Sequence, residues 1–377
     1  MNPISFRSDR DDLLFTPGPL TTSAATKQAM LRDLGSRDSG FLDLTQSIRH
    51  RLLKTAEVGD DYTAVLLQGS GTFSVEAVLS SVVPRDGKVL IISNGAYGHR
   101  MVEMARAQSI DHFVLEYAED QVPILGEIEK AFRPNEHDLK ITHLAMVHCE
   151  TTSGIVNPIQ EVGKLCQQYQ KTYIVDAMSS FGAMPISFEE ASIDYLISSP
   201  NKCLEGVPGF AFVIARQSEL KKSKGNARSL SLDLFAQWES LERAGEFRYT
   251  PPIQTILAFE QALNELDDEG GVQARMLRYQ ESHRVLLEGM MGLGFKTYLT
   301  PVAMGPIISS FHELNDSRFQ YKEFYERLKK RGFVIYSGKV SNAQCFRVGN
   351  IGRLFPADVI NLLSAMRDVL LEMGVQS

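Results

Sequence analysis

The sequence predicts an α/β protein with a mainly parallel seven-stranded sheet flanked by helices and a smaller C-terminal α+β domain. Seven short apolar runs recur between residues 60 and 215. Most of them are continuously apolar rather than alternating, which is typical of strands that helices cover on both faces. The segments between the runs are long enough for crossover helices. Together these observations favour repeated strand–helix–strand units and hence a mainly parallel sheet.

The expected elements of the large sheet follow one another along the chain. The apolar runs predict strands over residues 63–68, 88–93, 112–116, 143–148, 172–177, 194–199 and 209–215. Apolar residues at the spacing of one helix face predict crossover helices over residues 73–83, 98–108 and 159–169.

The pattern changes after about residue 254. Residues 254–289 are helical in pattern and contain the glycine-broken segment LDDEGG. We then expect strands over 306–311, 332–336 and 345–350 and helices over 321–331 and 357–373. The chain is therefore divided into an N-terminal segment (1–20), a large domain (21–260) and a small C-terminal domain (261–377).

The composition is that of a folded globular protein of 377 residues. Hydrophobic residues make up 44% and charged residues 23%, which excludes a disordered or fibrous chain. The formal net charge is −7 and Lys and Arg form no long block, so nucleic acid is not an expected partner.

Redox and targeting features predict a cytoplasmic location. The four cysteines are scattered without a C-x-x-C pair, which is typical of a reducing compartment. The opening MNPISFRSDRDD has no apolar signal region, and no apolar stretch approaches the roughly 20 residues of a membrane-spanning helix. We therefore expect neither export nor a membrane partner.

Polar segments follow four of the predicted strands. They are GSGTFSVEA, NGAYGHR, CETTSG and DAMSS. Ligands of open α/β sheets bind outside the carboxyl ends of the strands, so these segments are expected to surround the functional site.

The segment Gly69–Thr72 joins a strand to a helix and predicts a phosphate site. Backbone N–H groups and two hydroxyls would meet at a helix N-terminus, where the helix dipole favours an anion. The segment matches neither G-x-x-x-x-G-K-[ST] nor G-x-G-x-x-G, because no Lys follows and Ser74 takes the last glycine position. A merely tight glycine-rich turn is the alternative.

Three further residues complete a chemical set. Asp176 lies near the end of the strand 172–177, Lys202 follows the strand 194–199, and Tyr97 follows the strand 88–93. Individually they are explained as a strand cap, a solvated loop charge and a packing aromatic. Together with the phosphate segment they match the needs of pyridoxal phosphate, which requires an amine for a Schiff base, a carboxylate for its pyridinium nitrogen, an anion site and a flat apolar face.

The segments DAMSSFGAMP and DYLISSPNKCLEGVPGFAFVIA resemble the fold-type-I pyridoxal phosphate aminotransferases of the alanine–glyoxylate and serine–pyruvate branch. Within that branch, LLFTPGPLTTSAATKQAM, LLQGSGTFSVEAVL and FRVGNIG resemble the 2-aminoethylphosphonate–pyruvate transaminases. The similar blocks extend from about residue 13 to residue 354.

This resemblance implies roles for individual residues. Lys202 would form the Schiff base and Asp176 would keep the pyridine nitrogen protonated. The other implied cofactor contacts are the phosphate with Ser70, Gly71, Thr72 and Asn201, the ring face with Tyr97, and the phenolic oxygen with Thr152. Arg347 and Gly18 would bind the substrate, and the N-terminal segment would line the active site.

The resemblance also implies partners. Thr250 would reach the cofactor phosphate of a neighbouring subunit, so a homodimer with shared active sites is expected. The substrates would be 2-aminoethylphosphonate and pyruvate, and the products phosphonoacetaldehyde and L-alanine. Because the loop around Arg37 departs from the pattern of some members, an alanine–glyoxylate or serine–pyruvate type enzyme is the alternative. A salt bridge is the alternative for Arg347.

Other classes and sites are disfavoured. A dinucleotide-dependent dehydrogenase lacks its glycine fingerprint here, and a non-catalytic binding protein needs neither Lys202 nor Asp176. His143 and His148 are five residues apart along a strand and so point to opposite faces, and we assign no metal site. Cys203 is interpreted as a packing residue.

Overall fold

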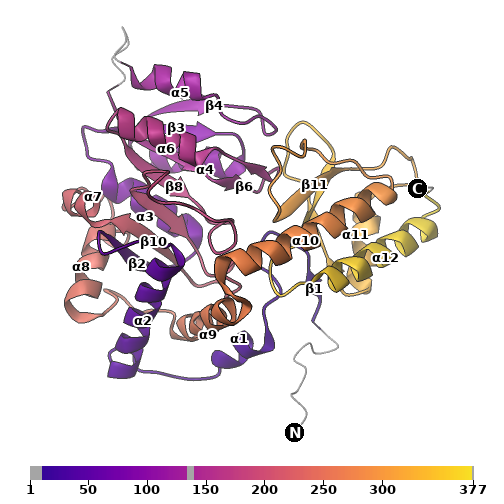
Figure 1. Cartoon of the computed structure of the whole chain (residues 1–377), viewed down its shortest axis with the longest axis horizontal. Coiled ribbons are helices and arrows are strands. Elements are labelled where there is room, and N and C mark those ends of the chain that lie inside the picture. The colour runs from indigo at the N-terminus through magenta and orange to yellow at the C-terminus, as the bar shows by residue number, and fades with distance from the viewer. Residues whose placement is uncertain (1–10, 134–139, 376–377) are drawn as a thin grey trace.

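The computed structural model describes residues 11–133 and 140–375. The N-terminal and middle parts of the chain form a large sheet with its helices on the left of Figure 1, and the C-terminal elements, coloured orange to yellow, lie on the right. The first ten residues of the predicted N-terminal segment fall outside the described part. Within the described ranges, no helix is both long and apolar enough to cross a membrane.

The central sheet has seven strands in the order β2-β10-β9-β8-β5-β3-β4. The strands are β2 (Tyr62–Gln68), β3 (Lys88–Ser93), β4 (Asp111–Glu116), β5 (Ile141–Val147), β8 (Thr172–Asp176), β9 (Tyr195–Ser198) and β10 (Phe210–Arg216). β10 runs antiparallel to both of its neighbours, whereas the other pairings are parallel. All seven predicted strands and the mainly parallel sheet are therefore confirmed.

Burial along the strands explains why their apolar runs are continuous. β5, β8, β9 and β10 are buried over nearly their whole length, because helices cover both faces of the sheet. β4 lies at the edge and is only half-buried. Since the parallel strands share one direction, their carboxyl ends meet along one side of the sheet.

The helices agree with the predicted ones to within about two residues where the two can be compared. They are α1 (Ala24–Ala29), α2 (Ser39–Thr55), α3 (Gly71–Val82), α4 (Ala96–Ala107), α5 (Leu125–Phe132), α6 (Ile159–Gln168), α7 (Gln217–Lys222), α8 (Leu234–Ala244), α9 (Ile253–Glu269), α10 (Gly271–Gly292), α11 (Tyr321–Lys330) and α12 (Pro356–Glu372). The predicted helical region 254–289 is two helices, because Gly270 and Gly271 both take positive φ, of 103° and 82°.

The C-terminal sheet has three strands, β11 (Ile308–His312), β14 (Cys345–Gly349) and β13 (Tyr336–Ser337), in that order. The predicted strand 332–336 is wrong as one element. It is divided into β12 (Phe333–Val334), which pairs with β1 (Leu13–Leu14), and β13, which pairs with β14. The buried Ile335 stands between the two pieces, where the chain changes from one sheet to the other.

Two large hydrophobic clusters support these layers. The first contains residues from Phe41 to Leu266 and surrounds the seven-stranded sheet. The second contains residues from Leu286 to Val375 together with Phe15 of the N-terminal segment. The N-terminal segment thus packs with the C-terminal elements, although the boundary placed at residue 260 stays a prediction.

Candidate active site

A cavity of about 220 Å³ lies at the carboxyl ends of the parallel strands. Seven of the predicted site residues line it: Ser70, Gly71, Thr72, Tyr97, Asp176, Asn201 and Lys202. Met178, Ser199 and Arg100 are among the other lining residues. The predicted residues Gly18, Thr152, Thr250 and Arg347 lie outside this lining set.

The N-terminus of α3 forms one end of the cavity. Ser70 precedes the helix in an extended conformation, and within the described structure its hydroxyl does not cap the helix. Gly71 begins the helix so close to Met178 that an added Cβ would lie 2.3 Å from the Met178 sulfur. The small residue, the free helix N–H groups and the two hydroxyls therefore make a cradle that suits an anionic group.

Arg100 is a site residue that sequence reasoning missed. Its Nη1 donates to the Thr72 hydroxyl at 3.3 Å, and its guanidinium lies 5.0 Å from the centre of the Tyr97 ring. The available signal was its position three residues after Tyr97, which places both side chains on one face of α4. Arg100 adds a positive charge to the anion cradle.

Glu150 and Thr152 position Tyr97 from behind. The Glu150 carboxylate accepts hydrogen bonds from the backbone N–H groups of Tyr97 and Gly98, both at 3.1 Å. The Thr152 hydroxyl donates to Glu150 at 2.7 Å and accepts from the Ala96 N–H at 2.8 Å. Glu150 was also missed, although it lies in the segment CETTSG. The two side chains hold the first turn of α4.

The Tyr97 hydroxyl lies in a positive environment. Burial raises its pKa, but a hydrogen bond with Thr151 and the charges of Lys202, Lys339 and Arg347 lower it, and the net shift of the pKa is downward. The ring therefore stands where several cations converge.

Asp176 ends β8 and is 5% exposed. Its Oδ1 accepts the Met178 N–H at 2.9 Å. Burial raises the pKa of the carboxyl to about 7, and the nearby Glu150 adds to this effect, while the Met178 hydrogen bond, Arg100 and Lys202 oppose it. The carboxylate needs a further cationic or hydrogen-bonding partner to be stable in its charged form.

Lys202 follows β9 and meets the N-terminal segment. Its Nζ donates to the carbonyl of Pro17 at 2.6 Å and lies 3.4 Å from that of Gly18. Gly18 has a φ of 105°, and a Cβ there would lie 2.5 Å from the Lys202 Nζ. Burial lowers the pKa of the amine, against the opposing effects of Tyr97 and Asp176. Burial thus favours the neutral amine, which is the nucleophilic form.

Arg347 lies on β14 and is 3% exposed. Its Nη1 donates to the Thr151 carbonyl at 2.9 Å and its Nε to the Ser337 carbonyl at 3.1 Å. Burial lowers the pKa of this guanidinium. Among the described residues no carboxylate forms an ion pair with Arg347, so the alternative of a structural salt bridge is not supported.

Thr250 lies at the surface of the single chain. Its carbonyl lies 3.4 Å from the Gln68 side-chain nitrogen, close to the loop that leads into α3. Asn201 lines the cavity beside Lys202. Thr250 therefore lies close to Gln68, just before the loop that leads into the cradle, but it does not line the cavity of its own chain.

The remaining sequence interpretations concern metal and thiol chemistry. His143 and His148 are buried, and burial lowers the pKa of each to about 4, which keeps the imidazoles neutral. The described part of the chain contains no group of three side chains able to hold a metal ion. Cys203 is buried and its Sγ lies 3.1 Å from the Ser179 carbonyl, and burial raises the pKa of the thiol.

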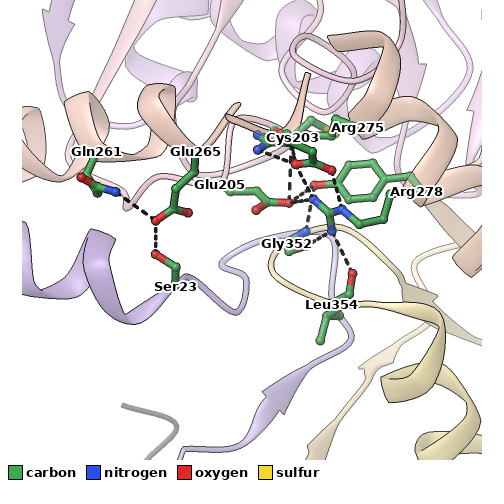
Figure 2. A network of polar contacts seen from close by, with 11 residues as sticks. Ser23, Cys203, Glu205, Gln261, Glu265, Arg275, Arg278, Gly352 and Leu354 are labelled. Atoms are coloured by element: carbon green, nitrogen blue, oxygen red, sulfur yellow. Dashed lines mark hydrogen bonds and ion pairs between the residues drawn. The ribbon is translucent and has the colours of Figure 1, made fainter. Parts of the chain in front are cut away.

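An ionic network links α10 to Glu205, in the segment that follows Lys202 (Figure 2). Arg278 of α10 donates to Glu205 at 2.5 Å and to Glu269 at 2.6 Å. Its Nη1 also donates to the carbonyls of Gly352 and Leu354, both at 2.8 Å. Because Glu205 follows Lys202 by three residues and Gly352 follows Arg347 by five, the network connects the two segments.

Comparison with known proteins identifies the family of this chain. Residues 22–349 match the class-V aminotransferase family. The chain belongs to that family. The predicted aminotransferase is confirmed, as is the predicted fold class, and the dehydrogenase and binding-protein alternatives are not supported.

Curated relatives are similar to this aminotransferase over almost its whole length. A protein of Salmonella paratyphi C and one of Klebsiella pneumoniae are 52% and 51% identical to it over 365 residues, or 96% of this chain and 99% of each relative. Both are named 2-aminoethylphosphonate–pyruvate transaminase.

Solved structures share its fold. Ureidoglycine–glyoxylate aminotransferase from Bacillus subtilis has a TM-score of 0.88 at 21% identity, covering 97% of this chain and 95% of that one. Alanine–glyoxylate aminotransferase from Nostoc sp. has a TM-score of 0.86 at 25% identity, covering 96% and 95%. These likenesses extend over both the sheet and the C-terminal elements.

Proposed function

We propose that this class-V aminotransferase uses pyridoxal phosphate to transfer the amino group of 2-aminoethylphosphonate to pyruvate, giving phosphonoacetaldehyde and L-alanine. The observation that carries the proposal is the convergence of Lys202, Asp176 and the α3 cradle on one cavity. Identity of 52% to relatives named for this reaction supports the choice of substrates.

The residues of the cavity fit pyridoxal phosphate. Ser70, Gly71, Thr72 and Asn201, with Arg100, supply hydroxyls, helix N–H groups and a positive charge for the phosphate. Tyr97 supplies a flat face, and Thr152 holds the first turn of α4 in place through Ala96. When bound, this cofactor offers an aldehyde that condenses with amines and a ring that withdraws electrons from the carbon next to the nitrogen.

Asp176 and Lys202 would act on different protons of the reaction. The Asp176 carboxylate is costly to charge in its buried position, so it would hold the ring nitrogen of the cofactor in its protonated form and would be stabilised by that contact. The Lys202 Nζ would supply the amine that holds the cofactor, and during the reaction it would accept the proton from the amine-bearing carbon of the substrate. The lowered pKa of Lys202 favours both tasks.

Arg347 binds the acidic group of either substrate. Its guanidinium is fixed by the Thr151 and Ser337 carbonyls, so little freedom is lost on binding. Gly18 lets the N-terminal segment approach Lys202 closely enough to close one side of the substrate position. The same site then serves the phosphonate in one half-reaction and the carboxylate in the other.

We further propose a cytoplasmic homodimer with shared active sites. Thr250 is exposed on the single chain and lies beside the loop that enters α3, so it is available to the cradle of a second copy. The four cysteines are free and buried, which agrees with a reducing compartment. Measuring the mass of the purified protein in solution tests the dimer, and a monomeric active species would contradict it.

The visible absorption spectrum of the purified enzyme tests the reaction. We expect a yellow band that bleaches when 2-aminoethylphosphonate is added without an acceptor and returns when pyruvate is added. A band that ignores 2-aminoethylphosphonate but bleaches with L-alanine or L-serine would favour an alanine–glyoxylate or serine–pyruvate type enzyme. No band after addition of pyridoxal phosphate would contradict the proposed cofactor.

A further inference from the structure

Lys339 brings a second cation, besides Arg100, to the Tyr97 ring. Its Nζ lies 4.9 Å from the centre of the Tyr97 ring. Its charge reaches Lys202 as well as Tyr97, because it acts on the pKa of both groups. Lys339 is exposed and belongs to the C-terminal domain, whereas Tyr97 and Lys202 follow strands of the large sheet.

The loop that carries Lys339 is held on both sides. Before it, β13 pairs with β14, placing Tyr336 opposite Arg347, and the Arg347 Nε donates to the Ser337 carbonyl at 3.1 Å. The Gly338 N–H donates to the Cys345 carbonyl at 2.9 Å, and a Cβ on Gly338 would lie 2.2 Å from that oxygen. Lys339 is therefore fixed relative to Arg347 through a shared sheet.

The other side of this loop is attached to the large sheet's loops. Glu119 accepts hydrogen bonds from the Ser341 N–H at 2.7 Å and the Ser341 hydroxyl at 3.2 Å. Ser341 and Asn342 also line a cavity of about 440 Å³ together with Gly95 and Ala96, at the start of α4. These contacts keep the loop beside the helix turn that carries Tyr97.

The charges of the substrates explain why two cations are needed. A carboxylate carries one negative charge, whereas a fully ionised phosphonate carries two and has three acceptor oxygens. Arg100 is directed to the α3 cradle through Thr72, and the Lys202 amine is favoured in its neutral form. Arg347 alone matches a carboxylate, and a second cation is required to match a phosphonate.

We propose that Lys339 is the second cation for the phosphonate group and so selects the amino donor, an inference that rests on the proposed transamination of 2-aminoethylphosphonate. Arg347 binds both acidic groups, and Lys339 distinguishes between them. Glu119 is a positioning residue that acts through Ser341.

The test compares the two half-reactions of the holoenzyme and its Lys339→Met variant, followed by absorbance. We expect kcat/KM for 2-aminoethylphosphonate to fall about 10- to 100-fold, the value of one charge-assisted hydrogen bond, and that for L-alanine to change less than about threefold. Lys339→Arg keeps the charge and should recover most of the loss. Lys330→Met, at the exposed end of α11, removes the same charge elsewhere and should change neither rate.

Binding of unreactive probes supplies a second readout. Methylphosphonate should inhibit the Lys339→Met variant about 10- to 100-fold more weakly than the unchanged enzyme, and acetate equally well. Glu119→Ala should shift the same ratio in the same direction by a smaller factor. If Lys339 had a purely structural role, its replacement would weaken inhibition by methylphosphonate and by acetate to the same extent.

The outcomes separate the two proposals. Equal losses for 2-aminoethylphosphonate and L-alanine, or no loss for either, would overturn the role of Lys339 and leave the proposed reaction intact. An unchanged enzyme that reacts with L-alanine but not with 2-aminoethylphosphonate would overturn the proposed reaction, and the role of Lys339 with it.

Discussion

Two regions of this protein bury charged groups within a few residues of each other, and they treat them differently. In the network around Arg278, the ion-pair distances between Glu205, Glu269, Arg275 and Arg278 are 2.5 to 3.9 Å. In the cavity, Asp176 accepts a backbone N–H and Lys202 donates to backbone carbonyls. One region matches opposite charges, whereas the other leaves ionisable groups to meet a ligand.

The pKa shifts follow the same division. In the network, burial raises the pKa of Glu269, but hydrogen bonds and charge from Arg278 and Arg275 lower it by more, so the net pKa is lowered. Burial lowers the pKa of Arg278, while Glu269 and Glu205 raise it, and the net pKa is raised. Both groups are kept charged. In the cavity, burial pushes Asp176 and Lys202 toward their neutral forms. A buried ionisable group therefore indicates a reactive site where the effect of burial on its pKa is larger than the opposing effect of its partners.

Replacing Lys202 by Ala is expected to have the largest effect on activity. Transamination should fall by at least about 10⁴-fold, because among the residues that the structure describes no other amine lines the cavity to hold the cofactor and move the proton. The free energy of unfolding of the cofactor-free chain should not fall, since a half-buried amine without a carboxylate partner at ion-pair distance is removed. Steady-state assays and urea unfolding measure the two quantities. Substantial turnover in this variant would contradict the assignment of Lys202.

Breaking the network should instead cost stability. Arg278→Met leaves the buried Glu205 and the half-buried Glu269 beside fewer cations, and we expect the free energy of unfolding to drop by about 3 to 5 kcal/mol. Urea unfolding measures the loss. Adding Glu205→Gln to Arg278→Met should recover part of it, because one uncompensated charge is then removed. If Arg278→Met alone were as stable as the unchanged protein, the ion pairs of the network would not stabilise the fold, and the contrast with the cavity would be refuted.

Asp176→Asn should make the cofactor-free chain more stable at alkaline pH. The folded pKa of about 7 exceeds the ordinary value, so between about pH 4 and 7 the native state holds a proton that the unfolded state has released. The contribution of Asp176 to stability is therefore present below about pH 4 and is lost as the pH rises through 7. Above pH 7 the gain on substitution should be on the order of 2 to 4 kcal/mol.

Thermal unfolding of the cofactor-free proteins across pH 4 to 8 checks this expectation. Asp268→Asn, at an exposed position of α9, is the matched control and should show no such trend. The same Asp176 variant should lose most of its transamination activity, because the ring nitrogen lacks its carboxylate partner. A gain that is equal at pH 4 and pH 8 would show that burial does not control the protonation of Asp176.

The smallest effect is expected at an exposed ion pair. Arg284 contacts Glu281 and Glu288 on the surface of α10 at 2.7 Å each, distances like those of the buried network. Water and salt screen such pairs, so Arg284→Ala should leave the urea midpoint unchanged within error. A clear loss of stability would mean that pairing distance, rather than burial, sets the value of the ion pairs.

The sequence alone determined much of the site. Continuous apolar runs identified all seven strands of the large sheet, because such runs reflect burial on both faces. In a mainly parallel sheet the residues that follow the strands must share one edge, which brought Ser70, Tyr97, Asp176 and Lys202 to one cavity. These features depend on local periodicity and on the direction of the strands, and both are readable from sequence.

Tertiary structure alone decided the contacts between distant segments. β1 pairs with β12 across more than three hundred residues, and this pairing divides the predicted strand 332–336. The partners of Arg278, and the approach of Lys339 to Tyr97, join residues that have no pattern in common along the chain. Periodicity records whether a side chain is buried. Which side chain it meets depends on how the large sheet, the N-terminal segment and the C-terminal domain pack, because charge pairing and hydrogen bonding are set by distances in space.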